Sequence, residues 1–358
     1  MAYTTIDDPT IFFNTILTTG TGNAQAVTGL GFQPDWIWGK RRDSTGHHTL
    51  FNSVIGITKG LETTNTNAEF TSSDYYTAFG SDGFTIAAGS SGAGNGSGQT
   101  AVQWCWKAGT AFSNDASSTS IGSIDSAGSV NDTAGFSICA YTGVSSAGTI
   151  KHGLSTAPSM IIFKNRSASN GWITYHHKNT SSPETDYLEL HSTNATADLN
   201  TIMADTLPTT SVFSIGTEGA VGGGNTNNFI AFIFSERKGY SKFGSYVGNA
   251  NDDGTFVYTG FKPAFVMIKN TSAGSTDWYM YDNKRGGPAA TIYGNNNKYF
   301  LKANTNAAEA NETFDMLSNG FKIRITNAFL NGDGNTFIYM AFAESPFVNS
   351  NGIPTNAR

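Results

Sequence analysis

The amino-acid sequence predicts an all-β fold made of three tandem antiparallel β-sandwich repeats of the jelly-roll type. One strand pattern occurs three times, at 31–40, 153–164 and 260–269. The composition, with 41 Gly, 13% aromatic and only 13% charged residues, is typical of a β-rich chain with many tight turns. Each repeat also shows about six or seven strand signals separated by clusters of Gly, Asn, Ser and Thr, which indicates a β-sandwich or jelly roll.

The repeated pattern is an apolar strand, here called the Pro-to-Lys strand, in which a lysine follows a proline by 6 positions. The pairs are Pro34 and Lys40, Pro158 and Lys164, and Pro263 and Lys269. Proline can open a strand but not sit inside a central one, because it has no N–H to donate to a neighbour. The second and third copies are apolar without alternation, so we expect strands buried on both faces.

The repeat extends to both sides of this strand. An aromatic-led strand precedes it, at 13–20, 136–143 and 243–248. Three elements follow it: a short strand (48–52, 172–176, 278–282), a Thr/Asn segment (65–69, 194–197, 304–309) and an apolar closing strand (102–107, 229–234, 337–342). Self-similarity at a period of about a hundred residues indicates tandem domains and not a short-period solenoid.

These patterns divide the chain into five segments. We expect an N-terminal arm with the first repeat at 1–107, a Ser/Ala/Gly-rich linker or surface excursion at 108–133, the second repeat at 134–238, the third at 239–345 and a tail at 346–358. Only a short join separates the second and third repeats, which we therefore expect to dock together.

Charge and cysteine usage narrow the function classes. The net charge of −6 and the lack of long basic runs argue against a nucleic-acid partner. No run of eighteen apolar residues and no signal-peptide pattern occurs, so we expect synthesis in a cytoplasm and no membrane insertion. Cys105 and Cys139 lie on expected strands; two buried thiols are favoured over a disulfide, and no zinc ligand set is visible.

The modules resemble a family of phage proteins. The residues that carry the resemblance are 141–143 (YTG), the three Pro-to-Lys strands, 81–84 (SDGF), 318–321 (SNGF) and 341–347 (AFAESPF). This combination is similar to repeated β modules of tail-fibre-like and other virion structural proteins of marine tailed phages, over nearly the whole chain. The resemblance implies a place in the virion, and it carries over no catalytic residues.

Several residues could carry chemistry, but each has a simpler interpretation. The three repeated lysines could line a polar groove, although a lysine that ends a buried strand more often reaches solvent or pairs with a carboxylate. The pairs His47-His48 and His176-His177 look like metal ligands, but adjacent strand residues point to opposite faces. Segment 249–254 (NANDDG) resembles a calcium loop but lacks a third spaced carboxylate, so we expect a tight turn. We therefore expect no metal and no cofactor.

Catalysis has no visible constellation in the sequence. No carboxylate pair is marked by an aromatic-walled setting at a strand end, and no nucleophile elbow occurs on a strand-to-helix turn. Six tryptophans could stack on sugar rings, but Trp36 with Trp38 and Trp104 with Trp106 favour the core of their repeat. We therefore expect a protein that is not an enzyme.

Three function classes follow from these observations. The first is a non-catalytic virion structural protein, a tail fibre or spike-type module that contributes to host attachment. The alternatives are a capsid-attached decoration or head-fibre protein, or a lectin-like module that binds carbohydrate. A polysaccharide depolymerase is the least supported.

The expected partners are copies of the chain itself, other virion proteins and a host-surface glycan. We expect a homotrimer, because closed symmetry hides exposed sheet edges. The N-terminal arm, with Ile11, Phe12 and Phe13, is the expected anchor to a neighbouring chain. For the receptor-facing end we predict a tyrosine- and asparagine-rich set, since these residues give adaptable contacts: Tyr279, Tyr281, Tyr293, Asn295, Asn296 and Asn297.

Overall fold

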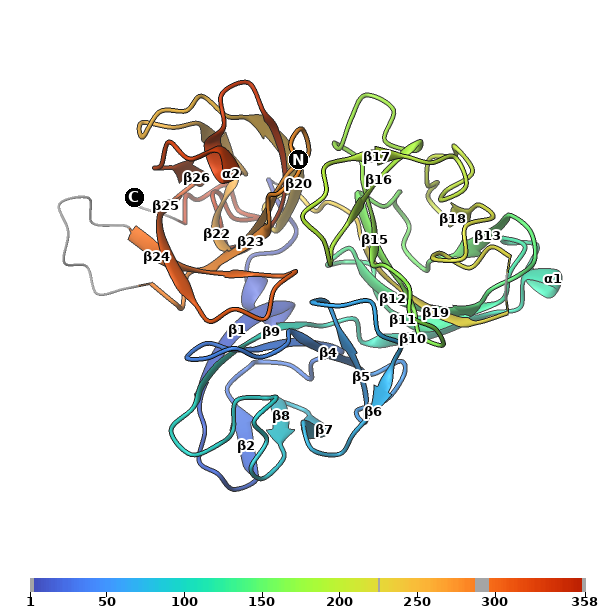
Figure 1. Cartoon of the computed structure of the whole chain (residues 1–358), viewed down its shortest axis with the longest axis horizontal. Coiled ribbons are helices and arrows are strands. Elements are labelled where there is room, and N and C mark those ends of the chain that lie inside the picture. The colour runs from blue at the N-terminus through green and yellow to red at the C-terminus, as the bar shows by residue number, and fades with distance from the viewer. Residues whose placement is uncertain (1–2, 225, 287–295, 356–358) are drawn as a thin grey trace.

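The computed structural model describes residues 3–224, 226–286 and 296–355, with the side chains of 296–298 excepted. The fold is almost entirely antiparallel β, as predicted, and its strands form three large and two small sheets in the described part of the chain. Figure 1 shows three lobes, coloured blue, green and orange to red, that meet at the centre of the molecule. We refer to them as the first lobe (13–106), the second lobe (110–234) and the third lobe (241–346).

The first lobe contains a large sheet and a small one. The large sheet has the order β1 (Phe13–Thr19), β9 (Thr100–Trp106), β3 (Trp36–Arg41), β4 (Thr49–Asn52), β5 (Lys59–Glu62) and β6 (Phe70–Thr71). The small sheet has the order β2 (Gln25–Thr28), β8 (Gly83–Ile86) and β7 (Tyr76–Gly80), and a 3-10 helix, η1 (Pro9–Ile11), precedes the lobe.

The second lobe has the same two layers with two additional strands at one edge. Its large sheet has the order β10 (Thr110–Asn114), β11 (Ser126–Asn131), β12 (Phe136–Thr142), β19 (Asn228–Phe234), β14 (Met160–Asn165), β15 (Ile173–His176), β16 (Asp186–Glu189) and β17 (Ala197–Asp198). The small sheet pairs β13 (Gly148–Lys151) with β18 (Val212–Ile215), and α1 (Ala116–Thr119) lies between β10 and β11.

In the third lobe one continuous sheet forms both layers. Its order is β20 (Ser241–Val247), β27 (Thr336–Pro346), β22 (Phe261–Asn270), β23 (Trp278–Asp282), β24 (Asn296–Lys302), β25 (Ala310–Leu317), β26 (Gly320–Ile323) and β21 (Phe256–Tyr258). A short helix, α2 (Ala328–Asn331), precedes β27. The strands at the two ends of this sheet, β20 and β21, are therefore both edges.

The three large sheets share one strand order at their centres. In each, the closing strand lies between the aromatic-led strand and the Pro-to-Lys strand, giving β1-β9-β3, β12-β19-β14 and β20-β27-β22. This agreement matches the repeated sequence pattern, whereas the division into three tandem repeats stays a prediction. In β3 and β14 the proline precedes the strand, but Pro263 lies inside β22 at a shift of register against β27. Such an irregularity tolerates proline, because the ladder is locally broken there.

The inner faces of the three large sheets pack against one another in a single central core. Rings from different lobes lie in contact: Trp36 stacks on Phe232 at 4.4 Å between centroids, and Phe342 lies 5.6 Å from Trp106 and 5.9 Å from Phe234. The sequence analysis assigned the tryptophans of the first lobe to that lobe's own core. That assignment is too narrow, because these rings fill a core shared by all three lobes.

The outer faces of the large sheets are covered within each lobe. Separate clusters lie between the two layers, for example Ile37 and Cys105 against Phe84 in the first lobe. Equivalent clusters fill the second and third lobes. The prediction that the second and third Pro-to-Lys strands are buried on both faces is confirmed, since β14 is buried along its whole length and β22 at every position except Lys262. Both cysteines are free and buried, as favoured.

Segment 108–133 is not the linker or loose surface excursion that its composition suggested. It contains β10 and β11, and β11 pairs with β12 in antiparallel register from Ser126 opposite Tyr141 to Asn131 opposite Phe136. Small residues fit this place because the strands approach closely: a Cβ on Gly128 would lie 1.9 Å from the carbonyl oxygen of Ile138. The segment therefore extends the second large sheet by two strands.

The N-terminal arm packs on its own chain. Phe13 is 1% exposed in the central core, and Phe12 packs against that core and lies 5.9 Å from Tyr240. Further out, the hydroxyl of Tyr3 donates to the carbonyl of Gly260, and Asp7 accepts from the hydroxyl of Ser350. The expectation that Phe12 and Phe13 anchor a neighbouring chain is wrong for this reason; Ile11 is 41% exposed.

Hydrogen bonds between lobes follow the repeat. The indole N–H of Trp172 in the second lobe donates to the carbonyl of Glu62 in the first at 2.8 Å. In the same way, Trp278 in the third lobe donates to Glu189 in the second at 2.9 Å. Since both tryptophans are buried, these bonds satisfy polar atoms that could not reach water.

The Thr/Asn segments form a second set of joints between lobes. The backbone N–H of Asn170 donates to Thr66 at 3.0 Å, that of Thr196 to Thr271 at 3.1 Å, and that of Gly46 to Asn306 at 2.9 Å. Two of these joints carry an ion pair, Arg166 with Glu69 at 2.7 Å and Arg42 with Glu309 at 2.9 Å. The Thr/Asn segment of each lobe thus docks on the next lobe in a closed cycle.

Among the described residues, no helix is long and apolar enough to span a membrane.

A shared core predicts that the three lobes unfold together. Trp36→Ala removes a fully buried ring that contacts two lobes, and we expect a loss of about 3–5 kcal/mol in the free energy of unfolding. Urea denaturation followed by circular dichroism should show one transition, shifted as a whole. Leu207→Ala, at a side chain that is 51% exposed, is the control and should shift it little. Separate transitions for separate lobes would contradict a common core.

Candidate functional site

Of the predicted receptor-binding residues, the two tyrosines that the structure describes lie in a core and not at a surface. Tyr279 and Tyr281 are 3% and 0% exposed, and their rings pack in the core of the third lobe against Phe300 and Phe314. They are therefore structural residues and not receptor contacts. Asn296 and Asn297 begin β24, where their backbones pair with Asp315 and Phe314. Tyr293 and Asn295 lie outside the described residues.

The three repeated lysines are buried and do not reach solvent, which corrects the interpretation from sequence. Lys164 is 0% exposed, and its ammonium donates to the carbonyls of Thr66 and Asn170 at 2.9 and 2.6 Å. Lys269 donates to the carbonyl of Thr276, and Lys40 donates to the carbonyl of Arg41 at 2.5 Å. Burial lowers the pKa of each lysine to about 8. Backbone carbonyls, and not carboxylates, accept the hydrogen bonds of these ammonium groups.

The histidine pairs make structural hydrogen bonds. His176 accepts from the backbone N–H of Lys178 through Nδ1 at 3.1 Å and bonds the carbonyl of Tyr339 through Nε2 at 3.1 Å. His48 accepts from the indole of Trp38 at 2.9 Å. Within the residues that the structure describes, no group of three or more His, Cys, Asp or Glu side chains could hold a metal ion.

The calcium-like segment 249–254 is a crossing between layers and not a tight hairpin. It joins β20 to β21, which lie at opposite ends of the third large sheet. The carboxylate of Asp253 pairs with Lys322 at 2.5 Å and Arg324 at 3.2 Å, while Asn249 and Asn251 accept from backbone N–H groups of the segment. Its polar side chains therefore stabilise the turn.

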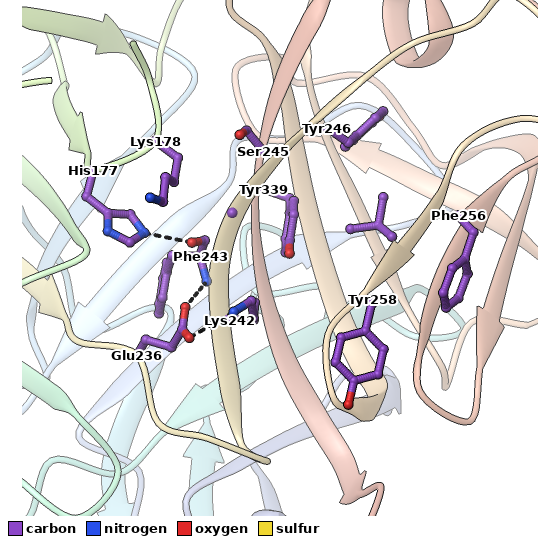
Figure 2. Close-up of a pocket in the computed structure, with 12 residues that line it drawn as sticks. His177, Lys178, Glu236, Lys242, Phe243, Ser245, Tyr246, Phe256, Tyr258 and Tyr339 are labelled. Atoms are coloured by element: carbon purple, nitrogen blue, oxygen red, sulfur yellow. Dashed lines mark hydrogen bonds and ion pairs between the residues drawn. The ribbon is translucent and has the colours of Figure 1, made fainter. Parts of the chain in front are cut away.

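A groove of about 590 Å³ lies where the second lobe meets the two edges of the third sheet. Figure 2 shows its walls: His177, Lys178 and Glu236 on one side, β20 along the floor and β21 on the other side. Along β21 the side chains alternate, with Val257 buried and Phe256 and Tyr258 exposed by 44% and 52%. We call these walls and the space between them the β20–β21 groove.

Charged groups organise one wall of this groove. Glu236 pairs with Lys242 at 3.0 Å and accepts from the backbone N–H of Phe243 at 3.4 Å. His177 donates from Nε2 to the carbonyl of Phe243 at 2.7 Å, and burial lowers its pKa. The arrangement places aromatic faces opposite polar groups, which suits recognition by stacking and hydrogen bonding.

The sequence did not predict this groove, although it contains a signal for it. The run Phe256-Val257-Tyr258 alternates with two aromatic residues on one face, which is typical of a strand with a solvated side. Glu236 reaches β20 through the short turn bridged by Arg237 and Ser241. Lys178 is brought there by packing between lobes, and no local pattern in the sequence marks that contact.

Comparison with known proteins gives a family but no activity. The family described as "Domain of unknown function (DUF7483)" matches residues 8–346, and the chain therefore belongs to it. No curated protein matches the chain significantly.

Replacing a repeated lysine should destabilise the fold. Lys164→Met leaves the carbonyls of Thr66 and Asn170 without their donor, at a cost of about 1–3 kcal/mol at pH 7. The folded state releases the lysine proton at lower pH than the unfolded state, so the wild-type advantage should grow as the pH rises above 8. Urea denaturation at pH 7 and 9.5 measures both effects. Lys178→Met, at an exposed lysine, is the control. Equal stability of all three proteins would contradict a stabilising role of the buried Lys164.

The buried His176 should make the fold sensitive to acid. Burial lowers its pKa from 6.5 to about 3, so the unfolded state binds a proton that the folded state refuses, and stability falls as the pH drops from 6.5 toward 3. His176→Gln keeps both hydrogen bonds without titrating. It should reduce the pH slope of the unfolding free energy by about 1.4 kcal/mol per pH unit.

The measurement is urea denaturation at several pH values between 7 and 4. His176→Phe serves as the matched control, because it removes the titration and the hydrogen bonds together and should also weaken the fold at pH 7. An unchanged pH slope in His176→Gln would show that other groups cause the acid sensitivity.

Proposed function

We propose that this protein is a non-catalytic virion structural protein, a tail fibre or spike-type module that contributes to host attachment. The similarity of its sequence modules to virion structural proteins of tailed phages supports the setting. The observation that carries attachment is the β20–β21 groove, where Phe256 and Tyr258 stand exposed opposite charged side chains. The rest of the molecule supplies a rigid β body, because three lobes share one core.

We also propose that the protein assembles as a homotrimer with other virion proteins, after synthesis in the host cytoplasm. Low charge and polar surfaces rich in Asn, Thr and Ser suit close packing between copies. The open edges of β1 and β20 are surfaces that symmetric assembly could cover.

A second candidate is a lectin-like module that binds a host-surface glycan, and the same groove favours it. Sugar rings stack on exposed aromatic faces such as that of Tyr258, while Glu236, Lys178 and His177 offer polar groups at the opposite wall. This activity is compatible with the first proposal. A capsid-attached decoration or head-fibre protein is the alternative location, and a depolymerase is the least supported class.

The location can be tested by immunogold electron microscopy of intact particles with antibodies raised against this chain. Gold at the tail fibres or spike supports the proposal. Gold on the head would contradict it in favour of the capsid alternative, and intact particles without label would overturn a place on the virion surface.

The binding role can be tested with the purified chain on a glycan array. Tyr258→Ala removes the ring on which a sugar would stack, so it should weaken any specific glycan binding at least about tenfold. Tyr339→Phe at the base of the groove, which keeps the ring, is the matched control. Shortening of host-surface polysaccharide by the chain, abolished by one Asp or Glu substitution, would instead indicate a depolymerase.

A further inference from the structure

Three strands occupy the same place in the three large sheets: β1, β12 and β20 each flank the closing strand on the side away from the Pro-to-Lys strand. The registers agree, since Phe13 pairs with Trp106, Phe136 with Phe234 and Ser241 with Phe342. The matching residues of the Pro-to-Lys strands, Trp36, Met160 and Phe265, lie across from the same three partners. What lies beside one of these strands is therefore informative about the other two.

Only β12 is covered within the described part of the chain. There β11 adds to it in antiparallel register, with Ser129 opposite Ile138, and β10 then pairs with β11. The added strand is made of small, uncharged residues (Ser126–Asn131) and is flanked by Asp125 and Asp132. The molecule thus carries its own example of a strand seated on this type of edge.

The equivalent edge of β20 is open at its centre. The backbone N–H and C=O of Phe243 point away from β27, because they bond the side chains of Glu236 and His177. Residues two positions apart on a strand point their backbone groups the same way. Ser245, which is exposed, therefore directs its N–H and C=O outward, and no partner for them occurs among the described residues. The carbonyl of Val247 accepts from Thr255 at 2.7 Å.

This open edge faces the β20–β21 groove, and β1 faces a similar one. The groove along β1 has a volume of about 560 Å³ and is lined by Thr15 to Thr19, by β2 and by Lys284. Both grooves lie between the edge strand of the large sheet and the edge strand of the second layer. An extended chain could therefore lie in each without moving either layer.

A lysine stands beside each open edge. Lys178 and Lys284 lie two positions after His176 and Asp282, which pair with Met160 and Phe265 on the Pro-to-Lys strands. The residue at this place in the first lobe is Val54, two positions after Asn52, which pairs with Trp36. Within the described residues, neither lysine forms an ion pair. Each of the two open edges thus has a lysine beside it, whereas the equivalent position in the first lobe is the uncharged Val54.

We propose that β20 is a docking edge that binds an extended strand of a partner protein by antiparallel β-addition. The strand it accepts resembles 124–133: small, uncharged residues in the centre and a carboxylate near an end to meet Lys178. The backbone groups of Ser245 and the N–H of Val247 form the ladder, and Phe256 and Tyr258 cover the outer side of the bound strand. This inference goes beyond the proposed place in the virion and does not depend on it.

The probe for this edge is a fluorescent peptide with the sequence of residues 124–133, IDSAGSVNDT, titrated into the intact chain and followed by anisotropy. Ser245→Pro is the informative variant, because its N–H points outward and its loss leaves the pairing with β27 intact. We expect saturable binding that weakens at least about tenfold in Ser245→Pro. A peptide N-methylated at alternate residues should lose the ladder and bind at least about tenfold more weakly.

Two further readouts make the outcome decisive. Hydrogen exchange on the wild-type chain should slow at Ser245 and Val247 when peptide is added, a result that does not depend on how any variant folds. Lys178→Glu should weaken binding more at low salt than at high salt. The proposal would be overturned by no binding, by binding that Ser245→Pro does not change, or by protection confined to other segments. Lys178 would then be a charge that keeps the edge free of partners.

Discussion

The fold depends on one constraint: each large sheet has a second apolar face that its own lobe cannot cover. The outer face packs on the small layer of the same lobe, whereas the inner face has only the other two large sheets to pack against. Three inner faces therefore meet, and aromatic side chains fill the space between them, with Trp36 and Trp106 reaching rings of the second and third lobes. A lobe alone would expose these rings to water, which costs about 25 cal/mol per Å² of apolar surface.

This constraint explains what the repeated motifs do. Lys164, the tryptophans Trp172 and Trp278 and the Thr/Asn segments form hydrogen bonds where lobes join. These bonds satisfy polar groups that burial would otherwise leave unpaired. Repetition here reflects a threefold set of joints and not a threefold set of binding sites. Residues that differ between lobes, such as the exposed Phe256 and Tyr258, are the ones free to carry recognition.

The sequence predicted the layers of the fold better than the candidate site. Proline position, unbroken apolar runs and turn clusters report local structure, so the strands and their burial on both faces could be derived. Burial by another lobe leaves no local trace: Tyr279 and Tyr281 alternate with Trp278 and Met280 on a strand buried on both faces, and nothing nearby distinguishes them from exposed tyrosines. Segment 108–133 reads as a linker for a related reason, since small residues suit both a loose chain and a close-packed strand.

The difference between covered and open edges is not imposed by stability. The second lobe covers β12 with β11 and β10. Lengthening the connection between two strands costs only about 0.6 kcal/mol for each doubling of its length. Within the described residues no further strand pairs with β1 or β20, and Lys284 and Lys178 lie where the first lobe has Val54. Along β20, Glu236 and His177 bond the backbone groups of Phe243, and Thr255 bonds the carbonyl of Val247. Among the described residues, the backbone groups of Ser245 and the N–H of Val247 therefore remain available on this edge for contacts outside the chain.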